Sequence, residues 1–107
     1  MTGSFGEMGN LLKQAQKMQR AMDEAREELR TTSVEGRAGG GVVRATVTGD
    51  GQVERIEITD EAFRAGDRAL IEELVLAAVR DGITKAGRMR DERLARVTGG
   101  LQLPGLF

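Results

Sequence analysis

The chain has 107 residues, 39% of them hydrophobic and 31% charged, which suits one soluble domain. It contains no cysteine and no histidine, which excludes disulfides, thiolate metal sites and the commonest catalytic proton shuttle. The net charge of −1 excludes a global field that draws the protein to nucleic acid, so charge-driven binding requires local clusters.

An apolar seam runs along the first predicted helix, over residues 8–30. Its members recur at spacings of three and four residues, as in a coiled coil: Met8, Leu11, Ala15, Met18, Met22, Ala25 and Leu29. A helix of this length extends about 35 Å, so the seam requires a partner helix. We expect the seam to pack inside an arm or a dimer; an adaptable methionine groove for other proteins is the less favoured alternative.

The charges of this first helix run against its dipole. Basic Lys13, Lys17 and Arg20 occupy the first half. The second half carries the acids Asp23, Glu24, Glu27 and Glu28. Because the helix dipole favours acids at the start and bases at the end, stability alone does not explain this order. The alternatives are a solvated helix face and a site for an anionic partner.

Three strands are predicted within residues 33–59. Val43, Ala45 and Val47 alternate with polar residues, which indicates a sheet with one apolar face. Glycine clusters at 39–41 and 49–51 predict the turns of an antiparallel meander. No Gly-Lys-Ser or Gly-Lys-Thr follows the first cluster, so a hairpin turn is favoured over a phosphate-binding loop.

A second long helix is predicted over residues 67–97, after a helical turn at 60–65. An apolar stripe fills its first half, and Gly82 and Gly87 predict close packing or a bend there. Its second half carries Arg88, Arg93 and Arg96. The remaining residues, 98–107, form an apolar tail that we expect to cover an arm or a dimer surface rather than to act as a docking peptide.

The order helix, sheet, helix places the free ends of both helices away from the sheet. Residues 50–73 hold eight acids and three bases, while residues 80–96 hold six bases and three acids. The sequence therefore predicts an α+β fold with an acidic body and cationic arm tips. The candidate phosphate contacts are Lys13, Lys17, Arg20, Arg88, Arg93 and Arg96, with Arg90 a weaker candidate.

The sequence offers little for catalysis or for a cofactor. Asp60, Glu61 and Asp67 lack the spacing of an EF-hand calcium loop and are expected to cap helices. No serine lies in a Gly-x-Ser-x-Gly motif. No apolar run reaches the about 18 residues of a membrane span. We therefore expect a cytoplasmic protein that is not an enzyme and that binds no metal or cofactor.

Three separated stretches carry a family resemblance. They are residues 12–19 (LKQAQKMQ), 34–43 (VEGRAGGGVV) and 98–107 (TGGLQLPGLF), which together resemble the YbaB/EbfC family of bacterial nucleoid-associated proteins. The resemblance covers nearly the whole chain as a single domain, 1–107. It implies a tweezers-like homodimer whose helical arms bind double-stranded DNA with limited sequence preference.

Two functions therefore stand open from the sequence. The favoured one is a nucleoid-associated protein that organises DNA or regulates genes through phosphate contacts. The alternative is a dimeric adaptor for replication or repair proteins. Residues 59–61 (TDE) stand where members of the family often have Asp-Pro, a departure that bears on the geometry of the arms rather than on the fold.

Overall fold

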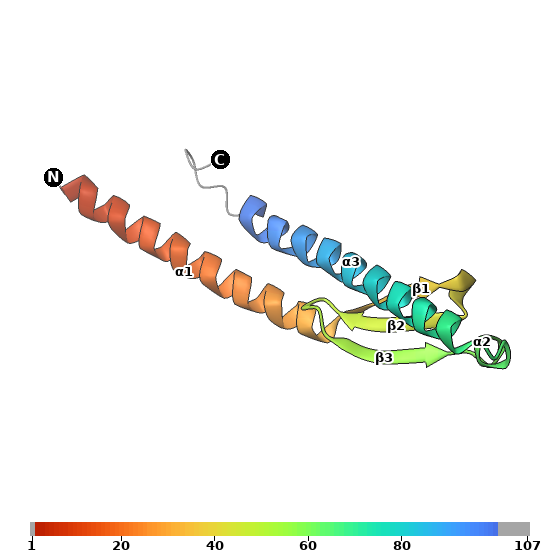
Figure 1. Ribbon diagram of the computed structural model, residues 1–107. Helices are drawn as coiled ribbons and strands as arrows, with labels where there is room; N and C mark the ends of the chain where they lie inside the picture. Colours follow the sequence, from red (N-terminus) through yellow and green to blue (C-terminus); the bar gives the residue numbers. More distant parts are fainter. Residues whose placement is uncertain (1, 101–107) are drawn as a thin grey trace.

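The computed structural model describes the backbone of residues 2–100 and the side chains of residues 6–99. Its elements are α1 (Thr2–Thr31), β1 (Ser33–Ala38), the 3-10 turn η1 (Gly39–Gly41), β2 (Val43–Thr48), β3 (Val53–Ile58), α2 (Asp60–Arg64) and α3 (Arg68–Gly100) (Figure 1). The predicted order of long helix, three-stranded antiparallel sheet and long helix is confirmed. The molecule measures 77 × 22 × 16 Å because both long helices run far past the sheet.

Both long helices extend beyond the predicted ranges. α1 begins at Thr2 rather than at residue 8, although Gly6 and Gly9 each cost about 1 kcal/mol relative to alanine in a helix. α3 continues to Gly100, and Thr98 Oγ1 donates to the carbonyl of Leu94 inside its last turn. Residues 98–100 are thus helical, and the rest of the predicted tail lies outside the described residues.

The sheet has the order β1-β2-β3 with both pairs antiparallel. Val34 pairs with Val47 and Ala45 with Ile56, which places the alternating apolar residues on one face. The turn between β1 and β2 is made by Gly39, Gly40 and Gly41, whose φ angles of 62°, 73° and 98° lie in the left-handed region. α3 covers the apolar face of the sheet, the face that carries Val43 and Ala45.

Glycines allow α3 to lie against the backbone of β1. A Cβ atom built on Gly36 falls 2.7 Å from the Cα of Gly82 and closer still to the carbonyl oxygen of Ala78. A Cβ on Gly82 falls 2.6 Å from a methyl carbon of Val47. The core beside this crossing contains the fully buried Val43, Ala45 and Ala78. Small residues therefore set the distance between helix and sheet.

Side chains of α3 also satisfy backbone groups of β1. Asp81 accepts from the backbone N–H of Arg37 at 2.9 Å, and the ammonium of Lys85 donates to the carbonyl of Glu35 at 3.1 Å. Asp81 and Lys85 are themselves paired at 2.9 Å. The Arg37 N–H and the Lys85 ammonium hold the pKa of the Asp81 carboxyl below its usual range.

The other edge of the sheet keeps an apolar surface exposed. Ile56 and Ile58 of β3 share the face of Ala45 and Val43, yet they are 38% and 42% exposed because α3 lies mainly over β1 and β2 (Figure 1). Leu76 and Ile83, seven residues apart on α3, are both 48% exposed. We call these four exposed apolar residues, two on β3 and two on α3, the apolar flank. An unpaired strand edge beside such a surface is typical of a protein interface.

The crossing of α3 over β1 predicts that Gly36→Ala destabilises the fold by about 1–3 kcal/mol, the usual cost of forcing a methyl group into a packed core. Gly87→Ala is the matched control, because its Cβ meets only the Arg90 guanidinium, at 3.8 Å. We expect this control to raise stability by up to about 1 kcal/mol through helix propensity. Urea denaturation followed by circular dichroism measures both changes, and equal effects of the two substitutions would contradict the crossing.

The lowered pKa of Asp81 predicts a pH-dependent contribution to stability. A carboxyl whose pKa is lower in the folded than in the unfolded state stabilises the fold above its unfolded value, about 3.9. This contribution disappears as the pH falls through the folded-state pKa. The stability difference between the wild type and Asp81→Asn should therefore be largest near neutral pH and shrink toward about pH 3. Denaturant midpoints measured across this range test the sign, and a constant difference would refute it.

Candidate nucleic-acid interface

α1 and α3 form one arm that projects from the sheet (Figure 1). The two helices run antiparallel, and Arg93 of α3 lies at the level of Glu28 of α1. With the same rise along both helices, Gly100 reaches about the level of Ala21 in α1. Residues 2–20 of α1 therefore extend beyond the end of α3, and we call this part the overhang.

Burial along the apolar seam falls from the sheet toward the overhang. Leu29 and Ala25 are buried, and Met22 and Met18 are half-buried. The outer members are exposed, with Leu11 at 61% and Met8 at 66%. Ala15 is exposed as well. α3 thus covers only the inner part of the seam, and a partner for the outer part stays a prediction.

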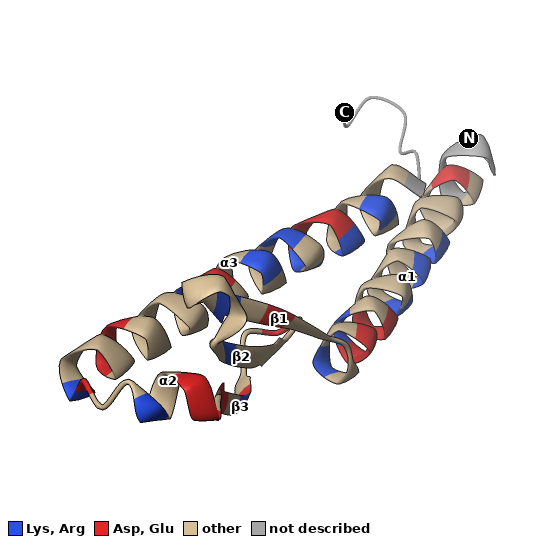
Figure 2. Cartoon of the chain, turned by 90° about the vertical axis from the view of Figure 1, so that its right-hand side faces the viewer, with Lys and Arg blue, Asp and Glu red and all other residues tan. Residues whose placement is uncertain are grey.

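The basic residues of α1 lie on the side of the helix opposite the seam. Lys13, Lys17 and Arg20 are spaced by four and three residues, so they form one stripe, and all three are exposed. They lie midway along α1 and not at its tip, because the helix begins earlier than the sequence indicates (Figure 2). Four acids of α1, Asp23, Glu24, Glu27 and Glu28, lie between this stripe and the sheet, and Glu7 lies on its other side (Figure 2).

Two of the three candidate arginines of α3 are also exposed. Arg88 follows the buried Ala86 by two residues and therefore points away from the packed face of the helix. Arg96 lies one turn from Gly100 and is exposed. Arg93 differs from both, because its guanidinium donates to the Glu28 carboxylate at 2.8 Å and its side chain is only 29% exposed.

Most of the candidate residues have no ion pair with a described side chain, whereas most other bases of the chain have one. Among the side chains of residues 6–99, no carboxylate pairs with Lys13, Lys17, Arg20, Arg88 or Arg96; Arg64 and Arg80 are the other two unpaired bases. The bases that do pair are Arg26, Arg30, Arg37, Arg44, Arg55, Arg68, Lys85, Arg90 and Arg93. A base with no carboxylate beside it keeps its full charge for an external anion. The arm therefore carries most of the uncompensated positive charge.

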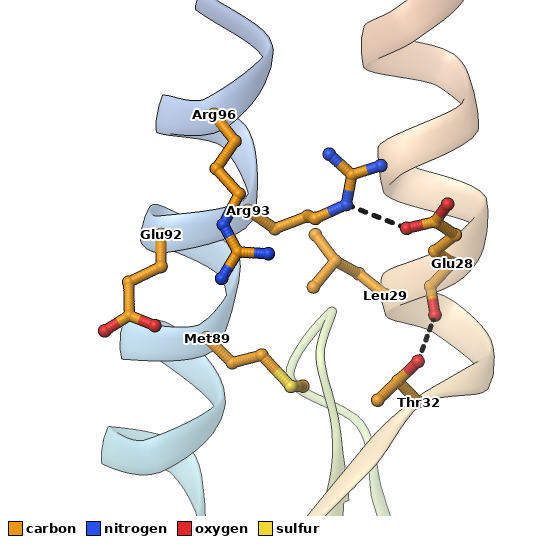
Figure 3. A pocket seen from close by; sticks show the side chains of 7 residues that line it. All are labelled: Glu28, Leu29, Thr32, Met89, Glu92, Arg93 and Arg96. Atoms are coloured by element: carbon orange, nitrogen blue, oxygen red, sulfur yellow. Dashed lines mark hydrogen bonds and ion pairs between the residues drawn. The ribbon is translucent and has the colours of Figure 1, made fainter. Parts of the chain in front are cut away.

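A small cleft separates α1 from α3 near the sheet (Figure 3). Its charged lining consists of two acids, Glu28 and Glu92, and two bases, Arg93 and Arg96. Arg93 reaches across the cleft, and its hydrogen bond and charge hold the pKa of Glu28 below its usual range. With its charges balanced, this cleft is a junction between helices rather than a strong site for an anion.

Metal clusters and membrane-spanning helices are two other features that the described part of the chain could carry. Across residues 2–100, no three acidic side chains come together in a group suited to a metal ion. No helix in this range has a stretch long and apolar enough to cross a membrane.

A comparison with protein families shows to which family this chain belongs. The family described as the YbaB/EbfC DNA-binding family matches residues 5–101. The chain belongs to this family. The match spans both helices of the arm and the whole sheet, and it confirms the resemblance seen in the three sequence stretches.

A curated relative and a solved structure agree with this membership. The nucleoid-associated protein Anae109_3761 of Anaeromyxobacter sp. (strain Fw109-5) is 42% identical over 96 residues, which cover 90% of this chain and 93% of the relative. The crystal structure of the uncharacterized protein HP0035 from Helicobacter pylori matches with a TM-score of 0.70 at 22% identity. That match covers 89% of this chain and 97% of the other. At this identity the second likeness shows the shared fold.

Sequence reasoning missed the ion pair of one candidate in this YbaB/EbfC arm. Ala86, Met89, Arg93 and Val97 follow one another at spacings of three and four, so Arg93 shares the packed face of α3 with two buried residues. This spacing was available as a signal. The weaker candidate Arg90 pairs instead with its neighbour Asp91 at 3.5 Å.

Proposed function

We propose that this protein is a homodimer that binds double-stranded DNA through phosphate contacts from its arms. Its role is nucleoid organisation or regional gene regulation in the bacterial cytoplasm. The observation that carries the proposal is the set of unpaired bases on the arm of a chain from a DNA-binding family. Lys13, Lys17, Arg20, Arg88 and Arg96 are the proposed phosphate contacts.

Phosphate contacts fit these residues better than base readout does. Lysine and arginine side chains on an exposed helix reach phosphate oxygens without entering a groove, and such contacts carry no direct sequence information. Because the net charge is −1, attraction to DNA depends on the local clusters and falls steeply as salt rises. The proposal is therefore salt-dependent binding with limited sequence preference.

The apolar flank supports a second copy of the chain as the partner of this surface. Ile56, Ile58, Leu76 and Ile83 are each between 38% and 48% exposed on a chain with only three aromatic residues and a thin core. Packing the flank of one copy against that of another removes this area from water and strengthens the core. Two arms, one from each copy, then reach the same duplex.

Removal of the α1 stripe tests the DNA contacts. Lys13, Lys17 and Arg20 are replaced together by glutamine, and binding to duplex DNA is measured by fluorescence anisotropy at rising salt. Loss of even one charged hydrogen bond, about 1.5 kcal/mol, weakens binding about tenfold. The slope of log affinity against log salt should also fall by about 0.9 for each phosphate that the variant no longer neutralises.

The matched control removes three bases that already have partners. Arg26, Arg30 and Arg68 pair with Asp23, Glu27 and Glu72, and their replacement by glutamine changes the net charge equally. We expect this control to keep the wild-type slope. Equal losses in both triple variants would refute the assignment of the stripe. Weak binding by the wild type that ignores salt would favour the protein-binding adaptor.

A charged residue in the apolar flank tests the dimer. Ile56→Asp places a carboxylate where the second copy is proposed to pack, so we expect a monomer in sedimentation velocity at micromolar concentration. Leu12→Asp is the control, because Leu12 is 60% exposed on the overhang and lies off the seam. A wild-type monomer, or an Ile56→Asp dimer with native circular dichroism, would refute this interface.

A further inference from the structure

The pair Glu28–Arg93 is the polar link between the two helices of the arm. Among the side chains of residues 6–99, no other hydrogen bond or ion pair joins α1 to α3. Ala25 of α1 and Val97 of α3, each about one turn from this pair along its helix, are small apolar residues and are buried. Small side chains pack with little interdigitation and constrain the distance between the helices only loosely. A hydrogen bond with a defined length and direction constrains this distance further.

Because this pair lies near the inner end of α1, a small change of helix angle there moves the basic stripe by a large distance. The inner end of α1 is held to the sheet, where the Leu29 carbonyl accepts from the backbone N–H of Gly49 at 2.9 Å. From there to Lys13 the helix rises about 25 Å, so a swing of about 10° displaces Lys13 by about 4 Å. This displacement exceeds the length of a charged hydrogen bond, about 2.8 Å. A contact that limits the swing therefore affects DNA binding beyond its own small energy.

We propose that Arg93 is a positioning residue that, together with Glu28, fixes the spacing between α1 and α3, and that Arg93 does not itself bind phosphate. This proposal rests on the proposed DNA-binding function and removes one residue from the expected phosphate contacts. Arg93 points across the cleft toward α1 (Figure 3), whereas Arg96 of the same cleft has no carboxylate partner among residues 6–99. The two arginines thus have separate roles one turn apart.

Neutral substitutions of the two partners distinguish a positioning role of Arg93 from phosphate binding, because the two roles predict opposite effects of Glu28→Gln on the affinity for DNA. If Arg93 bound phosphate, Glu28→Gln would remove a competing acid and tighten DNA binding, while Arg93→Gln would weaken it. If the pair sets the arm, both substitutions weaken binding by roughly two- to fivefold, the range of an exposed ion pair. The salt slope of Arg93→Gln should then match the wild type, and the slope of Arg96→Gln should fall by about 0.9 for each phosphate that Arg96 neutralises. Tighter binding by Glu28→Gln would overturn the proposal.

A measurement without DNA tests the same claim independently of the proposed function. Hydrogen–deuterium exchange is followed in the peptides that cover 20–32 and 86–98. We expect faster exchange in both Glu28→Gln and Arg93→Gln, and near-wild-type exchange in the double variant Glu28→Arg/Arg93→Glu, which restores the pair in reverse. Glu92→Gln is the control, since Glu92 lines the cleft without an ion pair within residues 6–99. Unchanged exchange in the two single variants would overturn the proposal. If the wild-type protein does not bind DNA but the exchange changes as expected, only the proposed function is overturned.

Discussion

The close approach of α3 to β1 is the constraint on which the rest of the structure depends. Gly36 and Gly82 leave no room for a Cβ atom between helix and strand, so the helix axis is fixed over one half of the sheet. Asp81 and Lys85 can then reach the outer backbone groups of β1, and β3 remains uncovered. The same crossing directs the far half of α3 along α1. The direction of the arm and the exposure of the apolar flank thus both depend on glycine at positions 36 and 82.

The positive surface of this molecule depends on which bases lack a carboxylate partner rather than on the net charge. Most bases near the sheet have a carboxylate within reach, and their fields are largely cancelled at short range. The stripe at Lys13, Lys17 and Arg20 differs, because no carboxylate among residues 6–99 pairs with it, while the acids Asp23 and Glu27 pair with Arg26 and Arg30 nearer the sheet. A protein with a net charge of −1 can therefore present a strongly positive surface to a polyanion.

Much of this fold could be predicted from local patterns. The seam spacing, the strand alternation and the glycine turn each depend on neighbours in sequence, which fix helix, strand and hairpin. The start of α1 could not be predicted well, because Gly6 and Gly9 disfavour a helix that nevertheless continues through them. The pairing of Arg93 with Glu28 spans 65 residues, and the capping of β1 by Asp81 spans 44. Such contacts depend on how elements pack, which propensity and spacing indicate only indirectly.

The capping of one sheet edge has a consequence for how many copies can assemble. α3 engages two outer backbone groups of β1, the N–H of Arg37 and the carbonyl of Glu35, so the edge of β1 is less open to strand pairing than the edge of β3. A sheet with one reactive side joins one neighbour and is then complete, whereas two reactive sides would allow an open-ended fibre. By occupying these two groups of β1, Asp81 and Lys85 disfavour the addition of a further strand at that edge of the sheet.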